Sequence, residues 1–171
     1  EFQNPTTGGI GLTDAKGGSS DITAMALQAL AVYRNHNTAA KNISDKALTY
    51  LANAMGDDFG YGTCESTAQV LLALTSMGID PLSDDFGTVN MNMITNLTGY
   101  IQSDNGFSHS MSISKSSEMS TVQALQALDS YRRFVNKETT YWDLKNKGEH
   151  AKHSWDAGTV TKKSTCKTKG T

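Results

Sequence analysis

The stretch that decides the fold is residues 63–75, TCESTAQVLLALT, because the chain carries it three times. Residues 19–31, SSDITAMALQALA, and residues 117–129, SEMSTVQALQALD, align with it without a gap. Repeats that start 44 and 54 residues apart are typical of stacked helical units, in which each unit buries its apolar face against the next. The copies share an opening hydroxyl, a threonine, two leucines and an alanine, at Ser19/Thr63/Ser117, Thr23/Thr67/Thr121, Leu27/Leu71/Leu125, Leu30/Leu74/Leu128 and Ala29/Ala73/Ala127.

Each copy is predicted to form a helix, because apolar residues recur in it at three- and four-residue steps. Within two positions of the opening hydroxyl comes an acidic residue, which is Asp21, Glu65 or Glu118. The hydroxyl can cap free backbone N–H groups, and the carboxylate opposes the positive end of the helix dipole. Gly78, with Pro81 beyond it, is expected to end the second helix. The predicted buried faces are Ile22, Met25, Ala26, Ala29, Leu30 and Tyr33; Val70, Leu71, Leu74 and Met77; and Val122, Leu125, Leu128 and Tyr131.

Two further amphipathic segments separate the copies, at residues 44–55, where Ser44 is the expected cap, and at residues 89–102. Glycine-containing turns precede all three copies, and short turns of this kind reverse the chain. We therefore expect an all-α fold of antiparallel helical hairpins in which the three copies run parallel. This domain spans residues 1–135, and residues 136–171 form an irregular polar tail. No outer helix is predicted before the first copy, so its apolar flank should be covered by the N-terminal stretch, a swapped element or a neighbouring molecule.

Charge is distributed unevenly along the 171 residues. Residues 1–136 hold 7 Lys and Arg against 13 Asp and Glu, whereas residues 137–171 hold 8 against 4. An acidic body argues against a nucleic-acid partner, because phosphate binding requires clustered Lys and Arg. A membrane span is also not predicted, because no apolar run approaches the roughly 18 residues that a spanning helix needs.

The two cysteines, Cys64 and Cys166, are too few for a disulfide framework, and neither belongs to a CxxC pair. The chain begins at Glu1 without methionine. It therefore reads as an internal fragment of a longer protein, in which any signal peptide would lie upstream.

The outer segments end in Tyr50-Leu51 and Tyr100-Ile101, and a glycine turn and a capped Ala/Leu-rich helix follow each of them. This order resembles the repeats of the α/α-toroid superfamily, which includes squalene cyclases, prenyltransferase β subunits, thioester domains and cobalamin carriers. The greatest similarity is to prenyltransferase/squalene-oxidase-repeat domains of secreted or surface-attached bacterial proteins. The resemblance implies part of a toroid, completed by a missing upstream half or a second copy, and an extracellular or cell-surface location in a bacterium.

Two shorter resemblances concern ligands. Residues 21–27, DITAMAL, are similar to the inner-helix signature of the cobalamin carriers, which makes a corrinoid one candidate ligand. Residues 153–170 resemble the start of a cysteine-bearing repeat of bacterial surface proteins. That repeat continues to a CxxC pair that this chain lacks, and His150, His153 and Cys166 alone do not make a convincing metal site.

In such toroids the ligand end is the mouth where the inner helices begin, and parallel helix N-termini would also attract polar groups there. The expected rim holds Asp21, Cys64, Glu65 and Glu118, with His109 in the insertion 108–115. Phe59, Tyr61 and Phe107 would form an aromatic floor. Two interpretations stay open: the acids bind a small or extended polar ligand, or they only stabilise helix starts. At a helix start, Cys64 should have a lowered thiol pKa.

No residue is assigned a catalytic role. The run Cys64-Glu65-Ser66-Thr67 lacks the glutamine of a thioester site, the Asp-x-Asp-Asp acid of the cyclases is absent, and no convincing zinc ligand set occurs. The sequence favours a non-catalytic ligand-binding or scaffold module. A divergent isoprenoid cyclase or prenyltransferase fragment and a structural spacer are the alternatives.

Overall fold

A computed structural model describes residues 2–13, 17–83, 85–87 and 90–143 of the chain. The described part contains α-helices and isolated bridges but no extended strand, which confirms the all-α prediction. The predicted cysteine-bearing repeat and most of the polar tail lie outside the described residues. The helices are α1 (Ser20–Leu30), α2 (Thr38–Ala54), α3 (Cys64–Ser76), α4 (Met93–Thr98) and α5 (Glu118–Val135).

The three sequence repeats begin their helices in the same way. The hydroxyls of Ser19, Thr63 and Ser117 each accept a hydrogen bond from the backbone N–H group three residues later, at the starts of α1, α3 and α5. Gly78, in the left-handed region at φ +72°, follows the end of α3. The caps predicted for the three repeats and the predicted stop of α3 are therefore confirmed.

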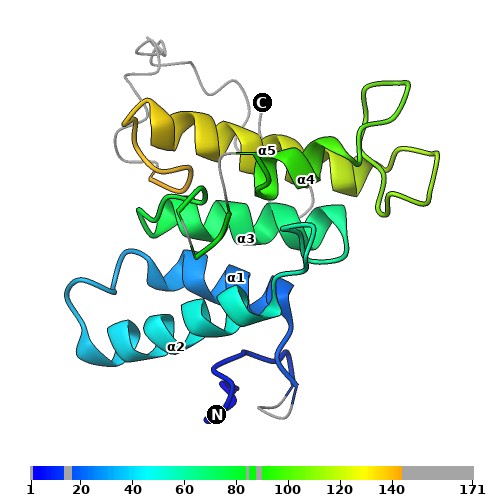
Figure 1. The fold of residues 1–171 in the computed structure, drawn as a ribbon. Helices are drawn as coiled ribbons and strands as arrows, with labels where there is room; N and C mark the ends of the chain where they lie inside the picture. The colour runs from blue at the N-terminus through cyan, green and yellow to red at the C-terminus, as the bar shows by residue number, and fades with distance from the viewer. Residues whose placement is uncertain (1, 14–16, 84, 88–89, 144–171) are drawn as a thin grey trace, which may run out of the picture.

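Helix α3 lies in the middle of a row, with α1 on one side and α5 on the other. All three begin at the same side of the molecule, on the right in Figure 1, and α2 runs in the opposite direction beside α1. Most of α3 is buried, which includes the predicted face of Val70, Leu71 and Leu74. No described helix precedes α1, as predicted, and α2, which follows it in the chain, packs against it.

Both outer helices differ from their predicted bounds. Helix α2 begins at Thr38, where Asn37 accepts from the Ala40 N–H at 3.0 Å, so Ser44 is not a cap but is fully buried inside the helix. Helix α4 covers only Met93–Thr98 of the predicted segment 89–102. It ends at Gly99, because the chain then turns to pair Ile101 with Phe107.

The buried faces predicted for the outer members of the row are wrong in part: Leu128 and Tyr131 pack against the core, but other predicted members do not. Met25 on α1, Tyr33 in the turn after α1, and Val122 and Leu125 on α5 are more than half exposed. Helix α5 instead buries the small side chains of Ser120, Ala124, Ala127 and Ser130. Small residues let neighbouring helices approach closely, and so the larger apolar residues are left at the edges of the row.

The glycine turn before each inner helix is held by the shared threonine. The hydroxyls of Thr23, Thr67 and Thr121 accept from the backbone N–H groups of Ile10, Tyr61 and Phe107, at 2.9, 3.0 and 2.9 Å. Two positions earlier stand Gly8, Phe59 and Asn105, and all three adopt positive φ values of 81°, 61° and 63°. The repeat is thus reproduced in the backbone, with Tyr61 rather than Phe59 as the counterpart of Phe107.

Candidate functional site

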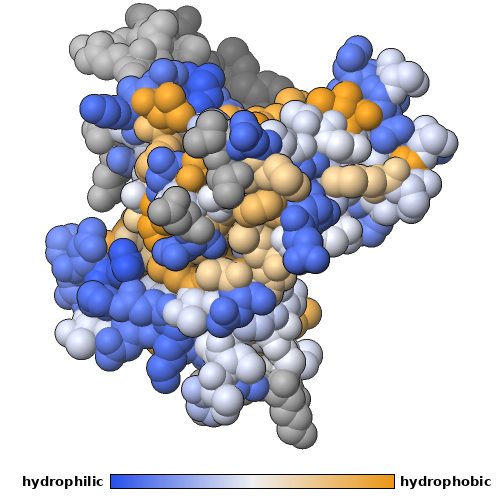
Figure 2. All heavy atoms as spheres, viewed as in Figure 1, coloured by the Kyte–Doolittle hydropathy of each residue, from blue (hydrophilic) through white to orange (hydrophobic). Residues whose placement is uncertain are grey.

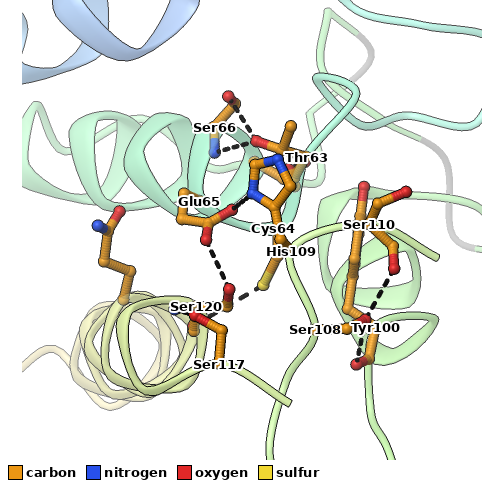
Figure 3. A network of polar contacts seen from close by, with 12 residues as sticks. Thr63, Cys64, Glu65, Ser66, Tyr100, Ser108, His109, Ser110, Ser117 and Ser120 are labelled. Carbon is orange, nitrogen blue, oxygen red and sulfur yellow. Dashed lines mark hydrogen bonds and ion pairs between the residues drawn. The ribbon is translucent and has the colours of Figure 1, made fainter. Parts of the chain in front are cut away.

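The expected mouth contains one connected polar cluster, formed by Cys64, Glu65, His109 and Ser120 (Figure 3). Glu65, in the first turn of α3, accepts from the Ser120 hydroxyl of α5 at 2.5 Å and bonds His109 Nδ1 at 2.8 Å. The Cys64 backbone N–H donates to the His109 carbonyl at 3.2 Å. The cluster therefore ties the starts of α3 and α5 to the loop that holds His109.

Hydrogen bonding sets the charge state of Glu65. Burial by itself would raise the pKa of this carboxyl, but donation from Ser120, from a backbone N–H and from His109 outweighs burial and lowers the pKa. Only 13% of the Glu65 side chain is exposed, against 57% for His109. At neutral pH Glu65 is therefore a carboxylate whose two oxygens are both engaged, so it joins helices rather than offering a free group to a ligand.

Cys64 is completely buried, with its sulfur 3.8 Å from the carbonyl of Ser120. Burial, and secondly the charge of Glu65, raises the pKa of the Cys64 thiol to about 12. The expected lowering of this pKa is wrong, because desolvation outweighs the helix dipole. The thiol is therefore protonated and closed to reagents from solution.

The three predicted aromatic residues do not share one environment. Phe107 is buried in the hydrophobic core, and Tyr61 packs against the core and donates its hydroxyl to the Leu51 carbonyl at 2.9 Å. Phe59 occupies the left-handed turn position. Phe107 and Tyr61 thus anchor their turns in the core.

Asp21 and Glu118 lie at the starts of α1 and α5, where they were expected. Asp21 is half-buried and Glu118 is exposed. Neither carboxylate forms a hydrogen bond or an ion pair with another described residue. Their position fits both a ligand contact and a simple stabilisation of the helix dipole.

A second feature, not anticipated from the sequence, lies on the face of the row that includes Met25 and Val32. Trp142 Nε1 donates to Gln28 Oε1 at 3.0 Å, Gln28 Nε2 donates to Gln69 Oε1 at 2.8 Å, and Gln69 Nε2 donates to Gln123 Oε1 at 3.0 Å. This glutamine ladder crosses α1, α3 and α5 in a single direction. The first donor, Trp142, belongs to the segment that follows α5. This segment reaches back to α1 at the other side of the row.

Beside the ladder lie two adjoining hollows of about 510 and 490 Å³, which share Gln28, Val32 and Trp142. No charged side chain lines the second hollow, whose remaining walls are Met25, Ala29, Gln69 and Gln126. Gln69 and Gln123 occupy one column of the repeat, and this match in the sequence could have predicted that the two side chains lie side by side. Trp142, which lies 114 residues from Gln28, gave no such signal.

Within the described ranges, no three His, Cys, Asp or Glu side chains come close enough together to hold a metal ion. No described helix combines the length and the apolar character that crossing a bilayer requires. Comparisons with protein-family models, with characterised proteins and with solved structures give no match for this chain.

Proposed function

We propose that this domain is a non-catalytic ligand-binding module of a secreted or surface-attached bacterial protein, built as part of an α/α toroid. The repeat of capped, parallel inner helices with an antiparallel outer helix supports the toroid. The bacterial and extracellular setting rests on the sequence resemblance alone.

The uncharged hollow beside Trp142 is the observation that carries the proposed binding role. Its volume of about 490 Å³ falls within the range of small-molecule sites, which are mostly apolar with a few placed polar groups. Met25, Ala29 and Val32 supply the apolar wall, and the glutamine ladder supplies amides. Such a lining favours a neutral, largely apolar molecule that carries a hydrogen-bonding group.

The nucleophilic groups of the mouth support a role without catalysis. Cys64 is buried as a neutral thiol, and Ser120 is fully buried and donates to Glu65. A nucleophile must reach a substrate and be activated by a neighbouring base. Neither side chain meets this condition in the observed arrangement.

Trp142 fluorescence provides a direct test, because the chain has two tryptophans and Trp155→Phe leaves Trp142 as the single reporter. The probes are cobalamin and farnesol. We expect a saturable change with one probe that Ala29→Phe abolishes by filling the hollow, whereas Ala39→Phe, at an exposed alanine of α2, preserves it. Loss of the fluorescence response to cobalamin in Asp21→Ala would identify a corrinoid as the ligand. No saturable change with either probe contradicts the proposed ligand class and favours a spacer.

A further inference from the structure

The strap, residues 136–143, follows α5 and crosses the groove formed by the two adjoining hollows (orange in Figure 1). Trp142 of the strap lines both hollows, which also share Gln28 and Val32. A single indole therefore divides what would otherwise be one continuous groove. Trp142 is 50% exposed, so its ring lies against the groove without being part of the core.

The wall that the indole faces is apolar, which is not how the outer surface of α2 is built. Figure 2 shows predominantly hydrophilic side chains where α2 faces the viewer. The second hollow is instead walled by Met25, Ala29 and Val32, and no charged side chain lines it. The strap thus covers an apolar wall with an apolar ring, as a bound aromatic molecule would do.

The polarity of the glutamine ladder determines what fits in place of the indole. Gln28 Nε2 donates to Gln69 Oε1 at 2.8 Å and also approaches the backbone carbonyl of Gln69 at 3.3 Å. Because a carbonyl can only accept, the Gln28 amide keeps its nitrogen toward α3 and its oxygen toward the strap. That oxygen accepts from Trp142 Nε1 at 3.0 Å. A molecule that replaces the indole must therefore bring its own donor to Gln28.

The strap is fixed firmly at its base and weakly at Trp142. Lys137 adopts the left-handed conformation at φ +56°, which turns the chain away from α5. The next residue, Glu138, is bonded by Arg132 at 2.7 and 3.2 Å. In contrast, the bond from Trp142 to Gln28 is exposed and joins neutral groups, so water can replace it at little net cost. The indole can thus leave the groove while the base of the strap stays on α5.

We propose that Trp142 is a built-in occupant of the groove, and that the ligand is a small neutral aromatic molecule with an N–H donor that takes the place of the indole against Gln28. This inference rests on the proposed binding role and narrows its ligand class. A group on a short tether competes at an effective concentration of about 10 mM. A ligand with an intrinsic dissociation constant of about 1 mM should therefore bind about tenfold more weakly while the indole is present.

Titration of the isotope-labelled full chain with free indole, followed by NMR, tests the displacement. Trp155→Phe is the parent, so that Trp142 gives its only indole N–H signal. We expect indole to shift this signal in the parent, and Trp142→Ala to bind indole about tenfold more tightly than the parent does. N-methylindole, which lacks the N–H group, should bind Trp142→Ala about three- to tenfold more weakly than indole. Gln28→Met, added to Trp142→Ala, should abolish this difference between the two probes.

A matched pair at Lys137 tests the strap without changing the groove. Valine is strained in the left-handed conformation, whereas glycine adopts it freely. Lys137→Val should therefore bind indole more tightly than the parent, and Lys137→Gly should bind it as the parent does. Circular dichroism establishes that both variants are folded. Equal affinities of the two variants for indole would count against release of the strap.

Two results overturn the inference and leave the binding role standing. Binding of indole to the parent that is as tight as to Trp142→Ala, or tighter, would show that the indole is a wall of the site rather than its occupant. Absence of indole binding to Trp142→Ala up to about 10 mM would exclude the inferred ligand class. In either case the fluorescence responses to cobalamin and farnesol decide the proposed binding role separately.

Discussion

Replacing Thr67 by valine removes the acceptor that holds the second glycine turn against α3. Thr67 is fully buried, and its hydroxyl accepts from the Tyr61 N–H at 3.0 Å, donates to the Thr63 carbonyl at 3.0 Å and lies 3.2 Å from Asn96 Oδ1. Valine keeps the shape and nearly the same helix propensity. It leaves the Tyr61 N–H without its acceptor, which costs about 1–3 kcal/mol, and we expect a loss near 2 kcal/mol.

The matched control is Thr67→Ser, which keeps the hydroxyl and removes one methyl group, for a loss of about 1 kcal/mol. Urea unfolding with an unchanged m-value measures both losses. A free energy of unfolding that decreases in the order wild type, Thr67→Ser, Thr67→Val supports a role for this hydrogen bond. A valine variant at least as stable as the serine variant would show that the turn does not depend on this hydrogen bond.

Three further predictions concern buried polar groups. Ser44→Ala should stabilise the fold by about 1 kcal/mol in urea unfolding, because the buried Ser44 hydroxyl has no partner among the described residues; a loss of stability would reveal one. Because folding lowers the pKa of Glu65, the stability that it contributes is present above its unfolded-state pKa and is lost as the pH falls through the folded value. Acid should therefore destabilise the wild type more than Glu65→Gln in thermal melts from pH 7 to about 3, and parallel curves would refute this. In Cys166→Ser, Cys64 should react with a thiol reagent at least about a hundredfold more slowly in the native state than in urea; comparable rates would contradict its burial.

Local signals predicted the helix starts of the repeats correctly. A hydroxyl followed by an acid describes the first turn itself, and Ser19, Thr63 and Ser117 perform the expected capping. The start of α2 was missed because Ser44 and Asn37 are both good caps. Residues 38–43, TAAKNI, can adopt a helical conformation, so the helix extends back to the earlier cap, Asn37.

Properties that depend on neighbours were not predictable from a single stretch. Val122 and Leu125 have the same apolar spacing as their buried counterparts in α3. They are exposed because α5 is the last helix of the row and no described helix covers its outer side. The position of Cys64 at a helix start suggested a reactive thiol, but packing against Ser120 reverses the direction of its pKa shift. The hollow beside Trp142 likewise depends on the path of the chain after α5.

The proposed toroid requires that the three repeat helices lie side by side in one direction. Distances between spin labels at Asp21→Cys and Met119→Cys, and at Asp21→Cys and Val135→Cys, test it in a Cys166→Ser background. Asp21 and Met119 should be about 20 Å apart, two helix spacings, whereas Val135 lies about 24 Å further along α5 and should be about 31 Å from Asp21. A shorter distance to Val135 than to Met119 would mean that α5 runs opposite to α1.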